Sequence, residues 1–193
     1  MKIVLASASG VRKKILNDYK IEFEAITSNV DEDQVKESLL LEKASPLVIS
    51  KNLAELKSTK VSNKKTDSLV LGADSVISLN NELINKPKSR EEALQILKKL
   101  NGSIHYLISS LCVSKNGSMI WNYTDKASLT MKQMREDELI SYLAKITDEA
   151  LYAYNVYQIE GEGRSLFSKI EGDEDTIMGL PIKKIKEYLN NYK

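Results

Sequence analysis

The Asn116-Gly117 pair is the feature that most constrains how this chain can fold. It joins residues 104–114 and 119–131, two long segments whose composition is typical of β-strands. Asn-Gly readily adopts the two left-handed backbone conformations of a tight two-residue turn, and it is the strongest hairpin signal in the sequence. These segments therefore predict a long antiparallel hairpin.

Shorter strand-like and helix-like segments interleave along the rest of the chain. Apolar runs and alternating patterns predict strands at residues 2–5, 21–27, 68–73, 76–79 and 166–170. Helical spacing and start signals predict helices that begin at Val11 or cover 45–62, 89–100, 135–145 and 181–192. Residues 147–163 show no clear period. The pattern predicts one α/β domain of residues 1–193 with two lobes.

The balance of charge argues against one class of function. The 193 residues include 28 Lys and Arg and 27 Asp and Glu, which gives a formal net charge of +1. A dedicated nucleic-acid-binding protein normally carries a clear basic excess, so we expect no nucleic-acid partner. With 42% hydrophobic and 28% charged residues, the composition is that of a globular protein.

The apolar segments and the single cysteine predict a cytoplasmic protein. The longest apolar runs, such as Leu69–Leu71, are far too short to span a bilayer, so we expect no membrane partner. The segment Met1–Ser7 has too few apolar residues for a signal peptide. Cys112 cannot form an internal disulfide, which suits a reducing compartment.

The segment Ser7-Ala-Ser-Gly-Val-Arg-Lys13 is the first candidate site. It lies between a predicted strand and a predicted helix, where small residues let the backbone approach a ligand and the helix N-terminus offers free N–H groups. Arg12 and Lys13 add positive charge, so the segment could bind an anion. It is not a P-loop, because no G-x-x-x-x-G-K-[ST] pattern is present. The alternative is an ordinary strand–helix connection with a solvated basic helix.

Asp74 is the second candidate, because it follows the apolar strand predicted at residues 68–73. An aspartate there is costly unless it caps, pairs, binds a metal or acts as a base. A turn aspartate with local hydrogen bonds is the alternative. The acidic loop Asp31-Glu32-Asp33 could hold Mg²⁺ or could simply be solvated. Taken singly, Lys57 and Lys86 are typical surface lysines.

His105 and Cys112 give no support to other common hydrolase mechanisms. His105 is the only histidine, and Cys112 lies in the middle of a predicted strand without a visible base partner. We expect both to be structural. The sequence contains no Ser-His-Asp order, no cysteine pair and no H-E-x-x-H motif.

The order of these motifs, rather than any one of them, resembles the Maf family of nucleoside triphosphate pyrophosphatases. The matching segments are Leu5–Lys13, Asp31-Glu32, Leu53-Ala54 with Lys57, Leu71–Val76, Asn85-Lys86-Pro87, Glu91–Ala93, Leu100–His105, Tyr157–Gly161, Ile170–Asp173 and Gly179-Leu180-Pro181. The resemblance extends from residue 3 to about residue 190. It implies a Maf/ITPase-like mixed-sheet α/β fold whose active-site cleft lies between two lobes.

The resemblance also implies an activity and the residues that perform it. Family members hydrolyse a nucleoside triphosphate to the monophosphate and pyrophosphate with the help of a divalent metal cation. Asp74 matches the catalytic base, and Glu32 matches an acidic residue associated with catalysis and metal, so both are expected to hold Mg²⁺ or Mn²⁺. Lys86 is expected to be catalytic and Lys57 to bind substrate. The phosphate-binding loop is matched by Ser7, Ser9, Arg12 and Lys13. The family also implies a homodimer.

Three positions differ from the branch of the family that acts on dTTP and UTP: Val11, Ser75 and Glu160. An ionised Glu160 only accepts hydrogen bonds, which suits the adjacent N1–H and N2–H donors of guanine better than uracil or thymine. The Tyr157–Gly163 stretch resembles the branch that hydrolyses 7-methyl-GTP. A guanine-type or modified-purine substrate is therefore expected, unless Glu160 points away from the base.

The leading hypothesis is a house-cleaning enzyme that removes modified nucleoside triphosphates before polymerases use them. A pyrimidine-preferring dTTP/UTP pyrophosphatase is one alternative. A nucleotide-binding regulator of cell division and septum formation is another, because the family has been linked to those processes. Asp74, Lys57 and Lys86 together favour turnover over binding alone.

Overall fold

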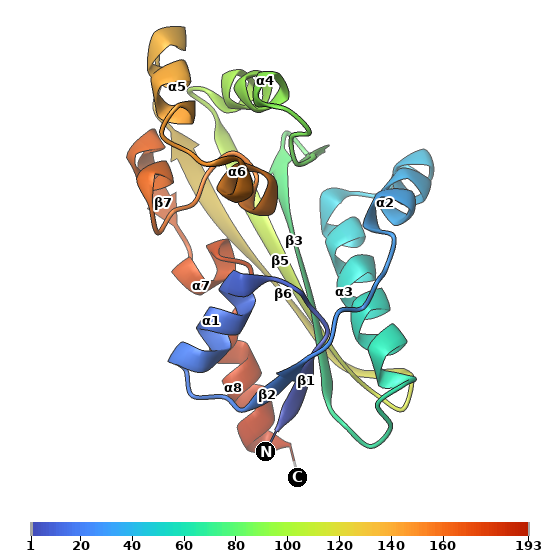
Figure 1. Cartoon of the computed structure of the whole chain (residues 1–193). Helices are drawn as coiled ribbons and strands as arrows, with labels where there is room; N and C mark the ends of the chain where they lie inside the picture. The colour runs from blue at the N-terminus through green and yellow to red at the C-terminus, as the bar shows by residue number, and fades with distance from the viewer. Residues whose placement is uncertain (1, 193) are drawn as a thin grey trace.

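A mixed β-sheet runs through the whole molecule (Figure 1). The computed structural model describes residues 2–192, with the side chains of residues 153 and 154 set aside. The strands are β1 (Ile3–Leu5), β2 (Phe23–Ala25), β3 (Val70–Leu79), β4 (Glu82–Ile84), β5 (Ile104–Lys115), β6 (Ser118–Met131) and β7 (Phe167–Glu171). Their order is β2-β1-β3-β5-β6-β7, and β4 pairs with β3 off this path. β1 is parallel to β2 and β3, whereas the other pairs are antiparallel.

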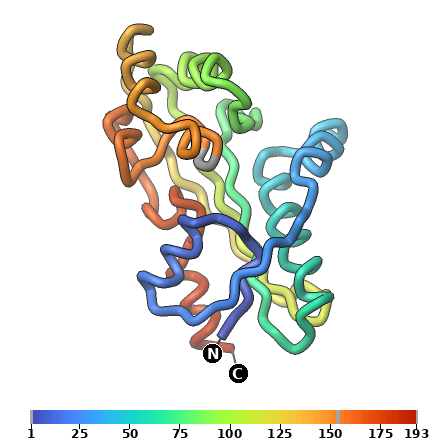
Figure 2. The backbone as a smooth tube through the Cα atoms, viewed as in Figure 1, coloured from blue at the N-terminus to red at the C-terminus, as the bar shows by residue number. Residues whose placement is uncertain are grey.

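Helices cover both faces of the sheet. They are α1 (Gly10–Asp18), α2 (Glu32–Leu41), α3 (Pro46–Ser62), α4 (Arg90–Leu100), α5 (Glu136–Leu143), α6 (Asp148–Tyr154), the 3₁₀ helix η1 (Glu162–Leu166), α7 (Glu174–Ile177) and α8 (Ile182–Asn191). α3 packs along one face of β3 and β5, whereas α1 and α8 lie on the other side. The tube in Figure 2 shows β1 and the end of α8 close together at one end of the molecule.

The long hairpin predicted from Asn116-Gly117 is confirmed. β5 and β6 pair along their length, and the two turn residues have φ values of 51° and 79°. The predicted helix starts are confirmed too. Ser45 and Ser89 each accept a hydrogen bond from the backbone N–H three residues later, at the starts of α3 and α4.

One local prediction was wrong, and one stretch without a clear period contains short helices. Residues 68–73 and 76–79 do not form separate strands, because β3 runs unbroken for 10 residues with Asp74 and Ser75 in its middle. That polar pair interrupts the apolar pattern and so imitates a strand end. Residues 147–163 contain α6 and the start of η1, which are too short to show a helical period in the sequence.

Two apolar clusters share one face of the sheet and are separated by a polar break. The lower cluster packs against α1 and α8, which lie in the lower part of Figure 1. The upper cluster packs against α4 and α5, which lie in its upper part. Strand residues of the lower cluster are Leu71, Ala73, Leu111 and Val113, and those of the upper cluster are Ile77, Leu79 and Leu107. Ser75 and Ser109 lie opposite each other between them. Because side chains alternate along a strand, both serines point to the face that carries the clusters.

β3 changes its edge partner at the level of this break. β1 pairs with Val70 and Leu71, and β4 pairs with Ile77–Leu79. Between these pairings, no described strand bonds to residues 72–76 on that edge. The middle of β3 is therefore open on one side, at the place where Asp74 and Ser75 lie.

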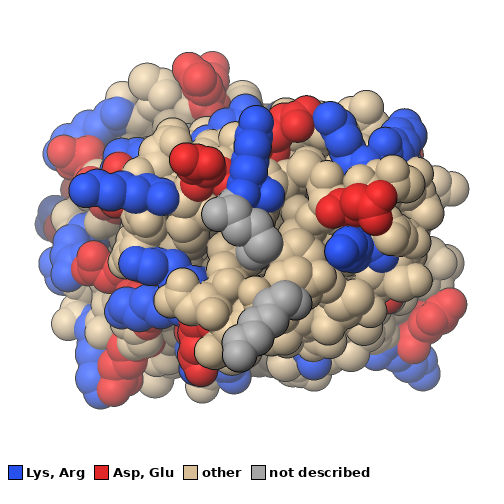
Figure 3. Space-filling model, turned by 90° about the horizontal axis from the view of Figure 1, so that it is seen from below, with Lys and Arg blue, Asp and Glu red and all other residues tan. Residues whose placement is uncertain are grey.

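The surface carries charges of both signs. On the face shown in Figure 3, the described basic and acidic side chains are interspersed with uncharged ones. The described residues of that face form no continuous basic stripe of the kind that follows a nucleic-acid backbone. Within residues 2–192, no helix is long and apolar enough to cross a membrane.

Replacing Gly72 with alanine tests the close approach of α3 to β3. An added Cβ would lie 2.2 Å from the carbonyl oxygen of Ala54 and 2.7 Å from the backbone nitrogen of Ser58. Because both atoms belong to the α3 backbone, we expect Gly72→Ala to lower the free energy of unfolding by about 3 kcal/mol in urea denaturation.

Gly10→Ala is the matched control, because an added Cβ there finds no heavy atom within 4 Å. Its free energy of unfolding should change by less than about 1 kcal/mol. Equal losses in the two variants would contradict a tight contact at Gly72.

Candidate active site

A cavity of about 690 Å³ opens beside the unpaired edge of β3. Its lining includes ten of the eleven residues that the family resemblance assigned to the site: Ser7, Ser9, Val11, Arg12, Glu32, Lys57, Asp74, Ser75, Lys86 and Glu160. The eleventh, Lys13, is half-buried on α1 and is not among the lining residues. Successive helical residues point about 100° apart, so Arg12 and Lys13 face different directions.

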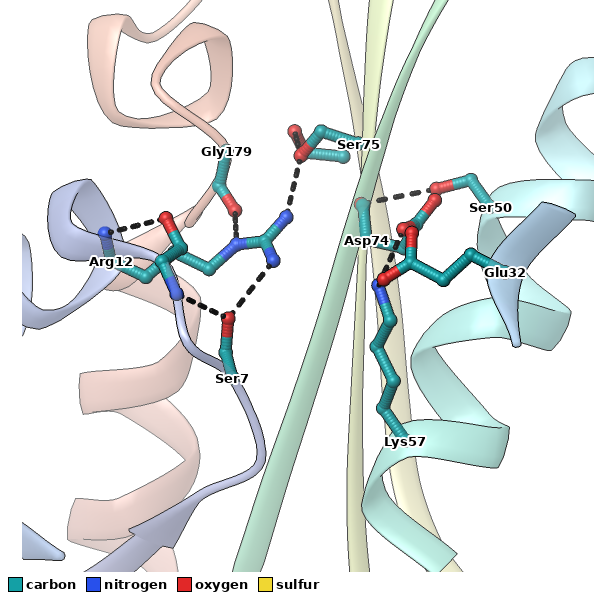
Figure 4. A network of polar contacts seen from close by, with 10 residues as sticks. Ser7, Arg12, Glu32, Ser50, Lys57, Asp74, Ser75 and Gly179 are labelled. Atoms are coloured by element: carbon teal, nitrogen blue, oxygen red, sulfur yellow. Dashed lines mark hydrogen bonds and ion pairs between the residues drawn. The ribbon is translucent and has the colours of Figure 1, made fainter. Parts of the chain in front are cut away.

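Lys57 forms the centre of a buried ion-pair network (Figure 4). Its Nζ lies 2.8 Å from Oδ1 of Asp74 and 2.8 Å from Oε1 of Glu32. Lys57 and Asp74 are 5% and 4% exposed, so each charge needs the other to offset its lost hydration. The network connects α3, the middle of β3 and the first turn of α2.

The two carboxylates of this network differ in proton affinity. Burial raises the pKa of Asp74, and the nearby charges of Lys57 and Arg12 offset only part of that effect. Burial also acts to raise the pKa of Glu32, but Lys57, Lys36 and Arg12 more than offset it, so that this pKa is lowered. Asp74 is therefore the better proton acceptor of the two.

The second carboxylate oxygen of Asp74 lacks a protein partner. Oδ2 is buried and receives no hydrogen bond from any described residue. The backbone carbonyl of Asp74, in contrast, accepts a hydrogen bond from Ser50 Oγ at 3.1 Å. An unsatisfied buried acceptor is costly and is often explained by a functional role. Oδ2 is thus the atom of this residue that is available to take a proton or to bind a cation.

Arg12 is fixed by acceptors from three separate parts of the chain (Figure 4). Its Nε donates to the carbonyl oxygen of Gly179 at 3.0 Å, its Nη1 to Ser7 Oγ at 3.4 Å, and its Nη2 to Ser75 Oγ at 3.2 Å. Partial burial lowers the pKa of Arg12, although Asp74 and Glu32 act to raise it. A guanidinium has five N–H groups, so two remain for a ligand.

The direction of the hydrogen bonds beyond Ser75 follows from counting protons. Ser109 Oγ donates its single proton to the carbonyl oxygen of Thr176 at 2.7 Å. It must therefore accept from Ser75 Oγ, which lies 2.8 Å away. Ser75 thus accepts from Arg12 and donates to Ser109, and its hydroxyl proton is not available to a ligand.

Ser7 has the opposite arrangement. Its Oγ accepts from the backbone N–H of Ser9 at 3.2 Å and from Arg12. With both lone pairs engaged, its own proton is left to donate. Ser9 caps α1 by accepting a hydrogen bond from the backbone N–H of Arg12 at 3.4 Å. The loop therefore presents a hydroxyl donor and a helix N-terminus to the cavity.

The segment 155–160 forms another part of the wall. Asn155 has φ 70° and ψ −155°, a conformation that non-glycine residues rarely adopt. The hydroxyl of buried Tyr157 lies 2.9 Å from Nε2 of His105, which anchors this segment to β5. Glu160 is exposed at the end of the segment and lines the cavity.

Several lining residues were not found from the sequence. They are Lys36, Glu149, Asn155, Tyr157 and Gln158. Lys36 could have been identified, because it lies four residues after Glu32, a spacing that places two side chains on one face of a helix. Ser109, which supports Ser75, required knowledge of the pairing of β3 with β5.

The ionisable groups that line the cavity are balanced in sign. The basic ones are Arg12, Lys36, Lys57 and Lys86, and the acidic ones are Glu32, Asp74, Glu149 and Glu160. With all of them ionised, the lining has no formal net charge. A highly charged anion would therefore bind better together with a cation.

Glu32 and Asp74 are the donors that fit a divalent cation. Among the described residues, no group of three or more His, Cys, Asp and Glu side chains is placed to hold a metal by itself. Mg²⁺ needs no such cage, because it is often bound by one or two carboxylates together with waters and substrate phosphates. The free Oδ2 of Asp74 and the half-exposed Glu32 fit that donor set.

His105, which lies near the site, makes the stability of the folded protein depend on pH. Burial lowers its pKa from 6.5 to about 4. Between these values the unfolded chain binds a proton that the folded protein does not, so stability falls as the pH falls from 6.5 to 4. We expect a loss of about 3 kcal/mol from this group.

Urea denaturation at both ends of that pH range, on wild type and His105→Gln, measures the effect. Glutamine does not titrate and can still bond to Tyr157, so the variant should lose about 3 kcal/mol less than wild type. Equal losses would show that His105 is not responsible.

Comparisons with known proteins support the resemblance to the Maf family that the sequence motifs indicated. A family model described as "Maf-like protein" matches residues 2–192. A nucleoside triphosphate pyrophosphatase of Pelagibacter ubique is 69% identical over 192 residues, which cover 100% of this chain and 98% of that protein. A 7-methyl-GTP pyrophosphatase of Rhizobium meliloti is 36% identical over 180 residues, which cover 93% of this chain and 90% of that protein.

A solved structure supports the fold alone. The structure of a HAM1 protein from Coxiella burnetii has a TM-score of 0.57 and 13% sequence identity, and the match covers 100% of both chains. The mixed-sheet α/β fold predicted from the sequence is confirmed. Given the family match over residues 2–192 and the identity to these relatives, the chain belongs to the Maf family.

Proposed function

We propose that this protein is a nucleoside triphosphate pyrophosphatase, which hydrolyses its substrate to a nucleoside monophosphate and pyrophosphate. The observation that carries the proposal is the buried Asp74 at the open edge of β3, with one carboxylate oxygen held by Lys57 and the other unpartnered. Relatives with this name match the chain over nearly its whole length. Asp74 paired in this way favours turnover over a purely regulatory role.

Asp74 is the proposed general base. Lys57 fixes Oδ1, so that Oδ2 can accept a proton from a water molecule. The water oxygen forms a bond to the α-phosphorus, and the bond from this phosphorus to the bridging oxygen of the β-phosphate breaks. Pyrophosphate leaves with the bonding electrons, and Asp74 holds the proton that the water released.

The loop between β1 and α1 is proposed to bind phosphate oxygens. Two N–H groups of Arg12 and the hydroxyl proton of Ser7 are free to donate. The N-terminus of α1, capped by Ser9, adds the positive end of a helix dipole. Lys86 lines the same cavity and supplies a further positive charge. Lys13, away from the cavity lining, has no proposed contact.

Glu32 and Asp74 are the proposed ligands of a divalent cation, Mg²⁺ or Mn²⁺. A bound cation of this kind neutralises charge on the phosphates as pyrophosphate leaves. The balanced lining of the cavity supports the need for a cation, because a nucleoside triphosphate brings about four negative charges that the lining alone does not neutralise.

We also propose that the protein is a homodimer and that it is located in the cytoplasm. Size-exclusion chromatography with light scattering would test the first proposal, and cell fractionation the second.

The proposed substrate is a guanine-type or modified-purine nucleoside triphosphate. Glu160 lines the cavity, and its carboxylate can accept hydrogen bonds from the adjacent N1–H and N2–H of guanine. Val11 and Ser75 also line the cavity, and the proton of Ser75 is already donated to Ser109. A relative named 7-methyl-GTP pyrophosphatase supports a guanine-type base.

The proposal predicts that Asp74→Asn abolishes most of the activity. The amide keeps the shape of the side chain but cannot accept the proton, so kcat for pyrophosphate release should fall about 1000-fold. Pyrophosphate release with Mg²⁺ or Mn²⁺ measures it, and a chelator should abolish wild-type activity until either cation is restored. Asp137→Asn, on the exposed part of α5, is the control and should retain full activity. An active Asp74→Asn variant would refute the role of Asp74.

The base preference is tested with UTP, dTTP, CTP, GTP and 7-methyl-GTP. We expect wild type to prefer guanine-type substrates, and Glu160→Gln to lower kcat/KM for them about tenfold, because one charge-assisted acceptor is lost. Glu162→Gln, an exposed neighbour, is the control. Activity confined to UTP and dTTP would argue for the pyrimidine alternative. An increase on GTP in Glu160→Gln would contradict the proposed contact of Glu160 with guanine.

A further inference from the structure

Lys36 lies on α2, one helical turn after Glu32, and lines the same cavity. The spacing of four residues places both side chains on one face of the helix, about 6 Å apart along its axis. Glu32 contacts Lys57 beside Asp74, so this face of α2 is directed toward the centre of the site. Lys36 is therefore positioned next to the place where the reaction is proposed to occur.

Lys36 differs from the two cations at the centre of the site. Lys57 is held by Asp74 and Glu32, and Arg12 directs three of its donors to protein acceptors. Lys36 is half-buried and forms no hydrogen bond or ion pair with the described residues. Its three ammonium N–H donors are available to a ligand.

Lys36 and Lys86 line the same cavity from different elements, and their charges interact. Lys86 follows β4, whereas Lys36 belongs to α2. Partial desolvation lowers the pKa of Lys86, Glu32 opposes this, and the like charges of Arg12 and Lys36 lower it further. An anion that binds both lysines offsets the electrostatic repulsion between them, so the pair favours a shared anionic ligand.

α2 itself is weakly anchored. None of its residues, all of which the structure describes, is buried. Its first turn is held by the Asp31 cap, whose side chain accepts from the N–H of Gln34 at 3.0 Å, and by the ion pair of Glu32 with Lys57. A ligand that joins Lys36 to Lys86 would add a connection between α2 and the segment after β4.

We propose that Lys36 is a further substrate-binding residue, which acts with Lys86 to hold the β- and γ-phosphates that leave as pyrophosphate. The inference rests on the proposed function, because it takes the α-phosphorus to lie near Asp74. The other two phosphates must then extend away from Asp74. Lys36, one turn along α2 from Glu32, lies in a position to meet them.

The test compares wild type with Lys36→Ala, Lys36→Arg and Lys51→Ala. Lys51 is exposed on α3 and is not among the cavity-lining residues, so its replacement removes the same charge away from the site. Four constants are measured: kcat, KM for the triphosphate, and the inhibition constants of inorganic pyrophosphate and of the nucleoside monophosphate product. Isothermal calorimetry with inorganic tripolyphosphate reports phosphate binding without turnover.

Lys36→Ala should raise KM and the inhibition constant of pyrophosphate about tenfold, the effect of losing one charged hydrogen bond. Its kcat and the inhibition constant of the monophosphate should change less than about threefold, because in this arrangement neither the nucleobase nor the α-phosphate contacts Lys36. Lys36→Arg should restore most of the affinity, since it keeps the charge. Lys51→Ala should match wild type.

An unchanged inhibition constant for pyrophosphate in Lys36→Ala would overturn the inference. An equal loss of affinity for the monophosphate would overturn the inference as well, because that result would place Lys36 at the nucleobase or the α-phosphate. If wild type releases pyrophosphate from no triphosphate, the proposed function fails, and the tripolyphosphate titration decides on Lys36 separately. A tenfold weaker titration in Lys36→Ala would then support phosphate binding, and an unchanged one would refute it.

Discussion

The ion pairs of Lys57 with Asp74 and Glu32 determine how the site is arranged. Lys57 and Asp74 are almost fully buried, and each would be strongly destabilising there without the other. The contact at 2.8 Å fixes one oxygen of Asp74 and leaves the other without a partner. The second ion pair, with Glu32, brings the first turn of α2 to the same place. One buried ammonium group thus positions the proposed base, a proposed metal ligand and the helix that carries Lys36.

The cavity exists because the sheet changes its pairing at this level. β3 bonds to β1 below and to β4 above, and its middle is open on that edge. On one face, Asp74 meets α3; on the other, Ser75 meets Arg12 (Figure 4). The open edge lets residues from both faces of the sheet line one cavity. The polar break between the apolar clusters, at Ser75 and Ser109, provides hydrogen-bond partners where the core could not tolerate unpaired polar groups.

Positive charges in the cavity have two kinds of role. Arg12 and Lys57 are engaged by protein acceptors, so they hold other groups in place as well as contributing charge. Lys36 has no such partner among the described residues and is suited to binding. Since the lining is neutral overall, the affinity for a polyanion depends on where each charge lies and on an accompanying cation rather than on a basic excess. This is consistent with a protein whose net charge is only +1.

The sequence alone determined the elements that depend on near neighbours. The Asn116-Gly117 turn and the capped starts of α3 and α4 each need only a few adjacent residues, and the order of short motifs was enough to indicate the family. The tertiary structure alone decided that β3 passes through Asp74 without a break, that Lys13 lies away from the cavity and that Lys36 lines it. Strand register and the pairing of buried charges join residues far apart in the chain. They are set by competition among packing, hydration and electrostatics across the whole fold, which no local pattern records.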